Sequence, residues 1–133
     1  MTMPRITLTR RDVGQLDALL GSAVIERIGK VGEFLLDELT RAEVVPDDQA
    51  PATLVTMNAK VRYRDEETGR IGAATLVYPK DAVGIDDAVS VLTPVGAALL
   101  GLSQGQSISY ETLDGRTKTI TVLEVLGRRT NGS

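Results

Sequence analysis

The chain of 133 residues contains no histidine, no cysteine and no tryptophan. Without histidine, no Ser-His or Cys-His nucleophilic pair can form, and the side chain that usually transfers protons near neutral pH is missing. Without cysteine, disulfide bonds, thiolate chemistry and Cys/His zinc sites are excluded. Any chemistry would therefore have to come from carboxylates, lysine, tyrosine or a borrowed metal. The expectation for the chain as a whole is a protein that is not an enzyme and that has no metal site and no other cofactor.

Aromatic residues are scarce, at 3% of the chain, and the formal net charge is −3. The acidic balance lacks the basic footprint of proteins that bind duplex nucleic acid. No apolar run approaches the roughly 18–20 residues of a membrane span, and the start of the sequence has no apolar segment typical of a signal peptide. A cytoplasmic location without membrane attachment is the expectation.

The beginning of the chain has the periodicity of helices. Thr9 can cap a helix whose first turn contains Asp12, a variant of the capping box with aspartate in place of glutamate. Val13, Leu16 and Leu20 then fall on one helical face. This spacing predicts a first helix over residues 10–20.

A second apolar stripe follows, made of Ile28, Val31, Leu35, Leu39 and Ala42. The charged side chains between these positions, Glu38 among them, are expected on the solvated surface. Neither helix can bury its narrow stripe alone, so two helices joined by a short connection are expected to pack as an antiparallel hairpin, a short coiled coil.

After a turn-rich segment with two prolines, the apolar period changes from 3.6 to 2. Residues 57–63 alternate apolar and polar side chains, as in a half-buried antiparallel strand, with Tyr63 on the buried side. Residues 71–78 are apolar on both faces, and strands at 107–111 and 116–125 flank an Asp-Gly turn.

These patterns predict an α+β fold. A short antiparallel helical hairpin comes first, and a twisted antiparallel β-sheet domain with one short helix, at residues 96–100, follows. The expected boundaries are 1–45 for the hairpin, 46–53 for the linker and 54–133 for the β domain.

The segment from Thr93 to Gly105 reads Thr-Pro-x-x-x-Ala-Leu-Leu-Gly-x-x-x-Gly. It resembles the signature of the C-terminal domain of Gre-type transcript-cleavage factors, which has the fold of the FK506-binding prolyl isomerases. Residues 55–61, 75–79 and 94–102 resemble a narrower group, the regulators of nucleoside diphosphate kinase (Rnk), which are short-hairpin relatives of the Gre factors. In layout, the resemblance spans nearly the whole chain.

The resemblance implies a transcription regulator that binds bacterial RNA polymerase at its secondary channel and competes with Gre factors without stimulating transcript cleavage. Leu99 and Leu100 are expected in the core, and no small-molecule substrate is implied. Any effect on a nucleoside diphosphate kinase would arise indirectly, through transcription. The contact with polymerase is placed at the corner formed by Thr93, Pro94, Val95 and Gly96.

An alternative is a Gre-like transcript-cleavage or elongation factor that uses carboxylates at the hairpin tip. The candidates are Glu26 and Glu33. On one helix, seven residues separate them by about 10 Å along the axis. Two carboxylates at that separation cannot share one Mg²⁺, which requires oxygen ligands at roughly 2.0–2.1 Å. Asp17 could approach Glu26 across the hairpin only if the turn between the helices is tight.

Two other functions compete with these. Prolyl isomerase activity follows from fold analogy alone, and the chain lacks the tryptophan and other aromatic residues of such pockets. The basic residues of segment 60–64 could bind nucleic acid, but acidic residues at 65–67 follow directly. We expect no strong direct nucleic-acid binding.

Overall fold

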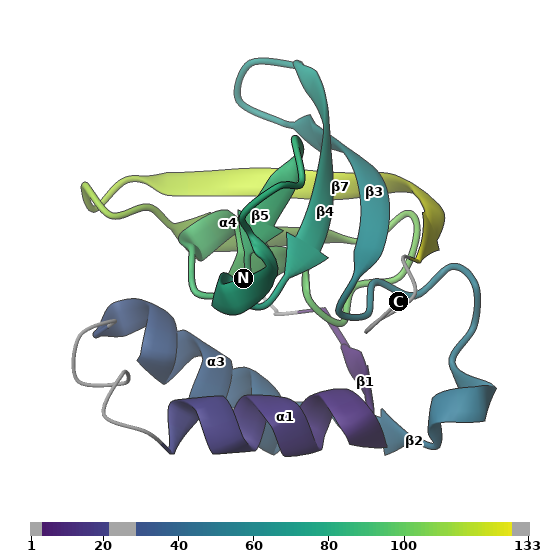
Figure 1. The fold of residues 1–133 in the computed structure, drawn as a ribbon. Helices are drawn as coiled ribbons and strands as arrows, with labels where there is room; N and C mark the ends of the chain where they lie inside the picture. Colours follow the sequence, from purple (N-terminus) through teal and green to yellow (C-terminus); the bar gives the residue numbers. More distant parts are fainter. Residues whose placement is uncertain (1–3, 22–28, 129–133) are drawn as a thin grey trace.

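The computed structural model of the protein describes residues 4–21 and 29–128. The N-terminal part contains β1 (Thr7–Thr9), α1 (Arg10–Leu20), α3 (Lys30–Arg41) and β2 (Glu43–Val45). The short 3-10 helices are η1 (Asp47–Gln49) and η2 (Pro79–Asp81). The rest consists of β3 (Ala59–Asp65), β4 (Ile71–Val77), β5 (Ala88–Ser90), α4 (Pro94–Leu99), β6 (Ser107–Glu111) and β7 (Thr117–Arg128). The predicted α+β order, helices first and sheet second, is confirmed (Figure 1).

The five-stranded sheet has the strand order β5-β4-β3-β7-β6. Three of its pairings are antiparallel, including the predicted β6–β7 hairpin. The pairing of β4 with β5 is parallel, so the sheet is mixed rather than wholly antiparallel as expected. The reason is the connection through residues 78–87, which includes η2 and returns the chain to the same end of the sheet before β5 begins.

The alternation predicted for β3 is present. Val61 is fully buried and Tyr63 packs against the core, whereas Arg62 is exposed. The basic groups of this strand lie beside carboxylates, as in the ion pairs Arg64–Glu66 at 2.9 Å and Lys60–Asp87 at 3.5 Å. These ion pairs reduce the positive charge that a phosphate backbone would need on this strand.

Helix α1 begins and ends at the predicted residues. The Thr9 side chain accepts a hydrogen bond from the Asp12 backbone N–H at 3.1 Å, which satisfies one of the orphan donors of the first turn. Leu16 and Leu20 form its buried face. In α3, Val31 and Leu35 are buried in the same way.

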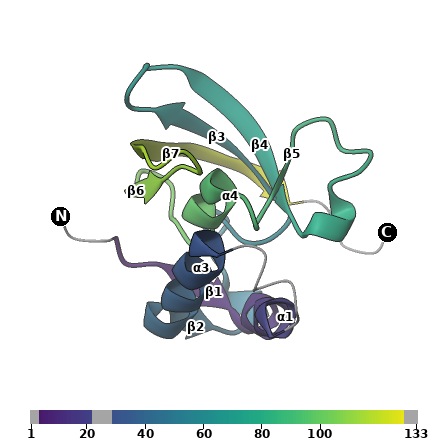
Figure 2. The ribbon, with the colours of Figure 1, turned by 90° about the vertical axis from the view of Figure 1, so that its left-hand side faces the viewer.

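The apolar stripes of α1 and α3 pack against the β domain as well as against each other. Leu16 and Leu35 belong to one continuous core cluster that also includes Val55 and Leu99 of the β domain. Figures 1 and 2 show both helices beneath the sheet, with α4 between the sheet and α3. The N-terminal helices are therefore packed onto the β domain through a shared apolar core.

Two short strands at the ends of the N-terminal part were not predicted from the sequence. β1 pairs in parallel with β2, with Leu8 opposite Val44. The Thr7 backbone N–H also donates to the Gly101 carbonyl at 3.1 Å. Gly101 has φ +81°, and a Cβ there would lie 3.0 Å from the Ile6 Cβ, so glycine permits both the turn and the close approach of this segment.

The expectation of a surface position for Glu38 was wrong. This side chain is only 1% exposed, and its Oε1 accepts from the Arg41 guanidinium at 2.7 Å. Arg41 also donates to the Pro4 carbonyl. Position 38 follows the buried Leu35 by three residues and so shares its helical face, where burial raises the pKa of the Glu38 carboxyl.

Candidate partner-binding surface

The strand-to-helix corner before α4 is held by the side chain of Thr93. Its hydroxyl donates to the Ser90 carbonyl at 2.6 Å and accepts from the Gly96 backbone N–H at 3.2 Å. Pro94 follows at the first position of α4, where a missing N–H costs nothing. Because the hydroxyl is used in both directions, Thr93 sets the shape of the corner.

Gly96 is buried at this corner, directly beneath the end of β5. A Cβ at this position would lie 2.1 Å from the Ser90 carbonyl oxygen, a distance that no side chain can adopt. Glycine is therefore required for the first turn of α4 to pass so close to the preceding strand. Leu99 and Leu100 are fully buried, as predicted.

The four residues predicted to contact a partner thus differ in what they can offer. Gly96 is buried, and the Thr93 hydroxyl is engaged within the corner. Val95 is half-buried and packs against the core. Pro94 is half-buried and is the one of these four residues that lines a groove.

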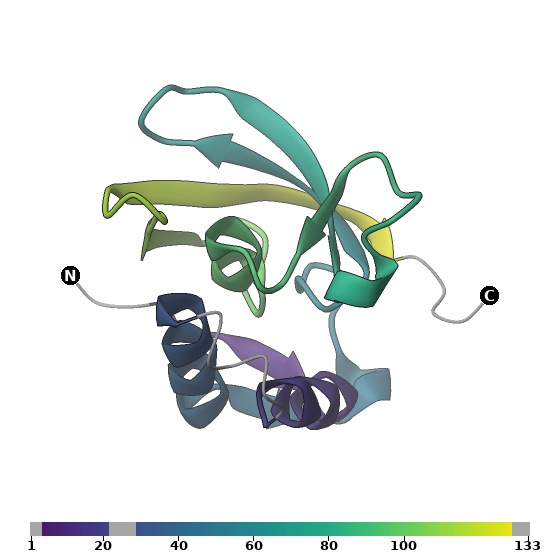
Figure 3. The ribbon, with the colours of Figure 1, turned by 60° about the vertical axis from the view of Figure 1, so that its left-hand side comes forward.

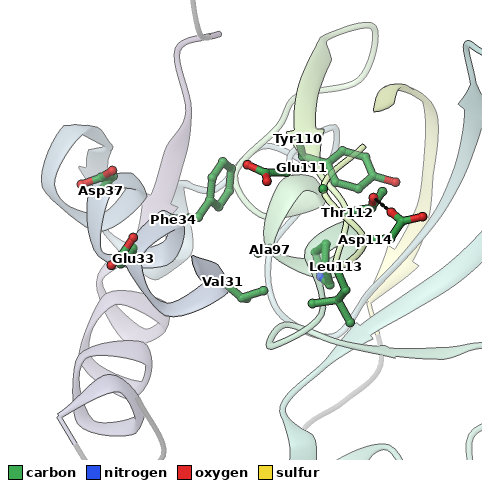
Figure 4. Close-up of a pocket in the computed structure, with 12 residues that line it drawn as sticks. Val31, Glu33, Phe34, Asp37, Ala97, Tyr110, Glu111, Thr112, Leu113 and Asp114 are labelled. Atoms are coloured by element: carbon green, nitrogen blue, oxygen red, sulfur yellow. Dashed lines mark hydrogen bonds between the residues drawn. The ribbon is translucent and has the colours of Figure 1, made fainter. Parts of the chain in front are cut away.

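That groove has a volume of about 730 Å³ and lies between α3 and the turn that joins β6 to β7. Figure 3 shows α3, in blue, below the end of the sheet that carries this turn. Figure 4 shows the lining side chains from both walls, with Phe34 of α3 facing Glu111 of β6. The groove also includes Glu33, the hairpin-tip candidate that the structure describes.

Several lining residues were not predicted from the sequence, because the groove depends on how α3 docks beside the β6–β7 turn. The clearest missed signal is Leu113, an aliphatic residue in the Asp-Gly turn that remains 86% exposed. The other unpredicted residues that line the groove are Val31, Phe34, Asp37, Ala97, Tyr110, Glu111, Thr112, Asp114 and Gly115.

Electrostatics at the groove are dominated by carboxylates. Asp114 accepts a hydrogen bond from the Thr112 hydroxyl, and this bond lowers the pKa of the Asp114 carboxyl. Burial raises the pKa of the Tyr110 phenol above its ordinary value. None of the lining residues that the structure describes is basic.

The hairpin-tip candidates are not brought together in the described structure. Glu33 lies in the first turn of α3, and Glu26 lies outside the described residues. Within residues 4–21 and 29–128, no group of three or more acidic side chains is arranged to hold a metal ion.

The described helices include none that is long and apolar enough to cross a membrane.

A second contact, between α1 and the segment before β3, is buried. The buried Asp12 accepts a hydrogen bond through Oδ2 from the Met57 backbone N–H at 3.0 Å. This oxygen therefore ties α1 to the β domain. Burial raises the pKa of Asp12, more than the bond from Met57 lowers it.

Comparisons with known proteins agree with this architecture in both halves of the chain. Residues 50–126 match the family model "Transcription elongation factor, GreA/GreB, C-term", and residues 4–45 match the model "Rnk N-terminus". The first match covers more than half of the chain and defines the class, a transcription factor with a GreA/GreB C-terminal domain. The second match covers the N-terminal helical part of the chain, and the chain therefore belongs to the Rnk family within this class.

Individual relatives support this assignment. A regulator of nucleoside diphosphate kinase from Escherichia coli is 35% identical over 125 residues, which cover 94% of this chain and 91% of the relative. A transcription elongation factor GreA from Chloroflexus aggregans is 33% identical over 109 residues, covering 82% and 67% of the two chains. The solved structure of a GreA/GreB-type factor from Nitrosomonas europaea is 38% identical, has a TM-score of 0.70, and covers 92% of this chain and 98% of that one.

Proposed function

We propose that the protein is a regulator that binds bacterial RNA polymerase at the secondary channel and competes there with Gre factors without stimulating transcript cleavage. The observation that supports this most directly is the combination of a GreA/GreB C-terminal domain with α1 and α3, the very short N-terminal helices of the described residues. The domain would supply the docking surface, and the helices would limit what reaches the polymerase active site.

Helix length supports the absence of cleavage activity. α1 has 11 residues and α3 has 12 residues, which correspond to about 16 Å and about 18 Å at 1.5 Å per residue. Both helices also share a core with the β domain, so part of this length lies alongside the domain. So short a hairpin would not carry a carboxylate far enough from the β domain to bind a catalytic Mg²⁺ in the polymerase active site.

The docking surface that we propose is the corner formed by Thr93, Pro94, Val95 and Gly96. Pro94 offers an apolar contact on a rigid base, because the Thr93 hydroxyl and the close approach of Gly96 to Ser90 fix the backbone around it. A rigid apolar contact loses little conformational entropy on binding. Any effect on a nucleoside diphosphate kinase would follow from altered transcription.

We expect Pro94→Lys to weaken binding to core RNA polymerase by about tenfold, because it places a charge in an apolar contact. Pro79→Lys is the matched control, since Pro79 also opens a short helix and is exposed elsewhere on the β domain. Affinities would be measured by titrating labelled protein with core polymerase. Equal weakening by both variants would contradict a contact at Pro94.

The second arm of the experiment uses backtracked elongation complexes. The protein should leave the RNA 3′ end intact when added alone, and it should slow the cleavage stimulated by a Gre-type factor in proportion to its concentration. RNA shortened by this protein alone would instead support the alternative, a Gre-like cleavage factor. Failure of the unsubstituted protein to bind core polymerase would remove the proposal altogether.

A further inference from the structure

The groove between α3 and the β6–β7 turn has the composition of a protein-binding surface. Its apolar lining comes from Val31, Phe34, Ala97, Tyr110 and Leu113. An apolar centre with a polar rim is the usual anatomy of a protein interface. Leu113 stands at the lip of the groove with 86% of its surface exposed, which costs free energy in the isolated protein.

Carboxylates lie on both walls of this groove. Glu33 and Asp37 are four residues apart and so project from one face of α3, and both are exposed. Glu111 and Asp114 lie on the opposite wall, at the β6–β7 turn (Figure 4). The Asp114 carboxyl already accepts from Thr112. Glu33 and Asp37 therefore carry the argument: two like charges one helical turn apart repel each other, and a partner of opposite charge would relieve that repulsion.

We infer that this groove binds a basic segment of RNA polymerase in which lysine or arginine side chains flank an apolar residue. The inference rests on the proposed function, because polymerase is the partner in both. The apolar residue would occupy the cavity between Phe34 and Leu113. The basic side chains would lie against the exposed carboxylates of Glu33 and Asp37 on the α3 wall.

A polypeptide fits this arrangement better than a small cation does. The carboxylates are divided between two walls that come from opposite ends of the chain, and the cavity of about 730 Å³ has room for several side chains. Pro94 also lines the groove. A segment bound here would therefore continue onto the corner proposed as the docking surface, and the two contacts would form one interface.

The test compares two double variants that change the net charge by the same amount. Glu33→Lys with Asp37→Lys reverses the charge of the α3 wall. Asp48→Lys with Asp86→Lys reverses two exposed carboxylates that do not line the groove. We expect the groove variant to bind core polymerase at least about tenfold more weakly, and the control variant to stay within about twofold of the unsubstituted protein.

Single variants at exposed aliphatic residues provide a test that does not depend on the fold of α3. Leu113→Lys should weaken binding by several-fold, whereas Val83→Lys, at a residue that is 90% exposed outside the groove, should not. A photo-crosslinking residue at position 113 should capture a polymerase peptide that contains basic residues beside an apolar one.

The possible outcomes separate the two proposals. If the unsubstituted protein fails to bind polymerase, the proposed function and this inference both fail. If it binds, and the groove variants at positions 33, 37 and 113 bind equally well, the inference fails while the proposed function stands. Equal weakening by the groove and control variants would also overturn the inference, because it would indicate long-range attraction without a specific groove.

Discussion

Gly96→Ala is expected to lower the free energy of unfolding by about 3 kcal/mol or more. The added methyl group would lie 2.1 Å from the carbonyl oxygen of Ser90 and 2.8 Å from its carbonyl carbon. Both atoms belong to the backbone, so the clash cannot be relieved by rotating a side chain. The corner would have to open. The Thr93 hydroxyl would then lose both of its hydrogen bonds, the one that it donates to the Ser90 carbonyl and the one that it accepts from the Gly96 N–H.

Chemical denaturation followed by circular dichroism would measure this loss. Gly14→Ala is the matched control, because Gly14 lies inside α1 with nothing within 4 Å of the added methyl group. That control should raise stability by about 0.5–1 kcal/mol, since alanine is the better helix former. A Gly96→Ala variant as stable as the original protein would contradict the close approach at the corner.

The second large effect is expected at Asp12. Asp12→Ala should lower the free energy of unfolding by about 2 kcal/mol, because it leaves the buried Met57 N–H without an acceptor. Asp12→Asn keeps an oxygen that can accept this bond and should lose clearly less. Urea denaturation of both variants at neutral pH checks the order, and a loss as large for asparagine as for alanine would contradict the assigned bond.

The same carboxyl gives a pH dependence of known sign. Burial raises the pKa of Asp12 above its ordinary value of 3.8, so the folded protein holds this proton at pH values where the unfolded chain has released it. The contribution of Asp12 to stability therefore falls as pH rises from about 4 through the folded-state pKa. In the Asp12→Asn variant, the side chain at this position does not titrate.

Between about pH 4 and about pH 7, the original protein should consequently lose unfolding free energy relative to the Asp12→Asn variant as the pH rises. Denaturation curves of the two proteins at matched pH values measure this difference in unfolding free energy. Glu38, whose pKa is also raised, titrates in both proteins and cancels from the comparison. If this difference stays constant, or if the original protein gains stability relative to the variant as the pH rises, burial does not set the pKa of the Asp12 carboxyl.

Local patterns predicted local elements well. Thr9 and the spacing of Leu16 and Leu20 predicted the bounds of α1, and the Asp-Gly turn predicted the β6–β7 hairpin. These elements follow from contacts between residues close in sequence. The resemblance around Pro94 added the family, which the comparisons confirm.

Features that depend on distant residues could not be read from periodicity. β1 and β2 are three residues each and exist because they pair across the whole helical segment. Asp12 has the spacing of a capping residue, but its acceptor oxygen serves Met57, 45 residues away. The groove likewise forms only because α3 and the β6–β7 turn meet in space.

The parallel pairing of β1 with β2 has a consequence for how such proteins can change in size. The helical segment begins after Thr9 and ends before Glu43, and the strands at its two ends, β1 and β2, lie side by side. Turns added in matched numbers at the distal ends of both helices would leave this junction and its link to Gly101 untouched. Reach can therefore evolve, or be engineered, as a separate property from the attachment to the β domain.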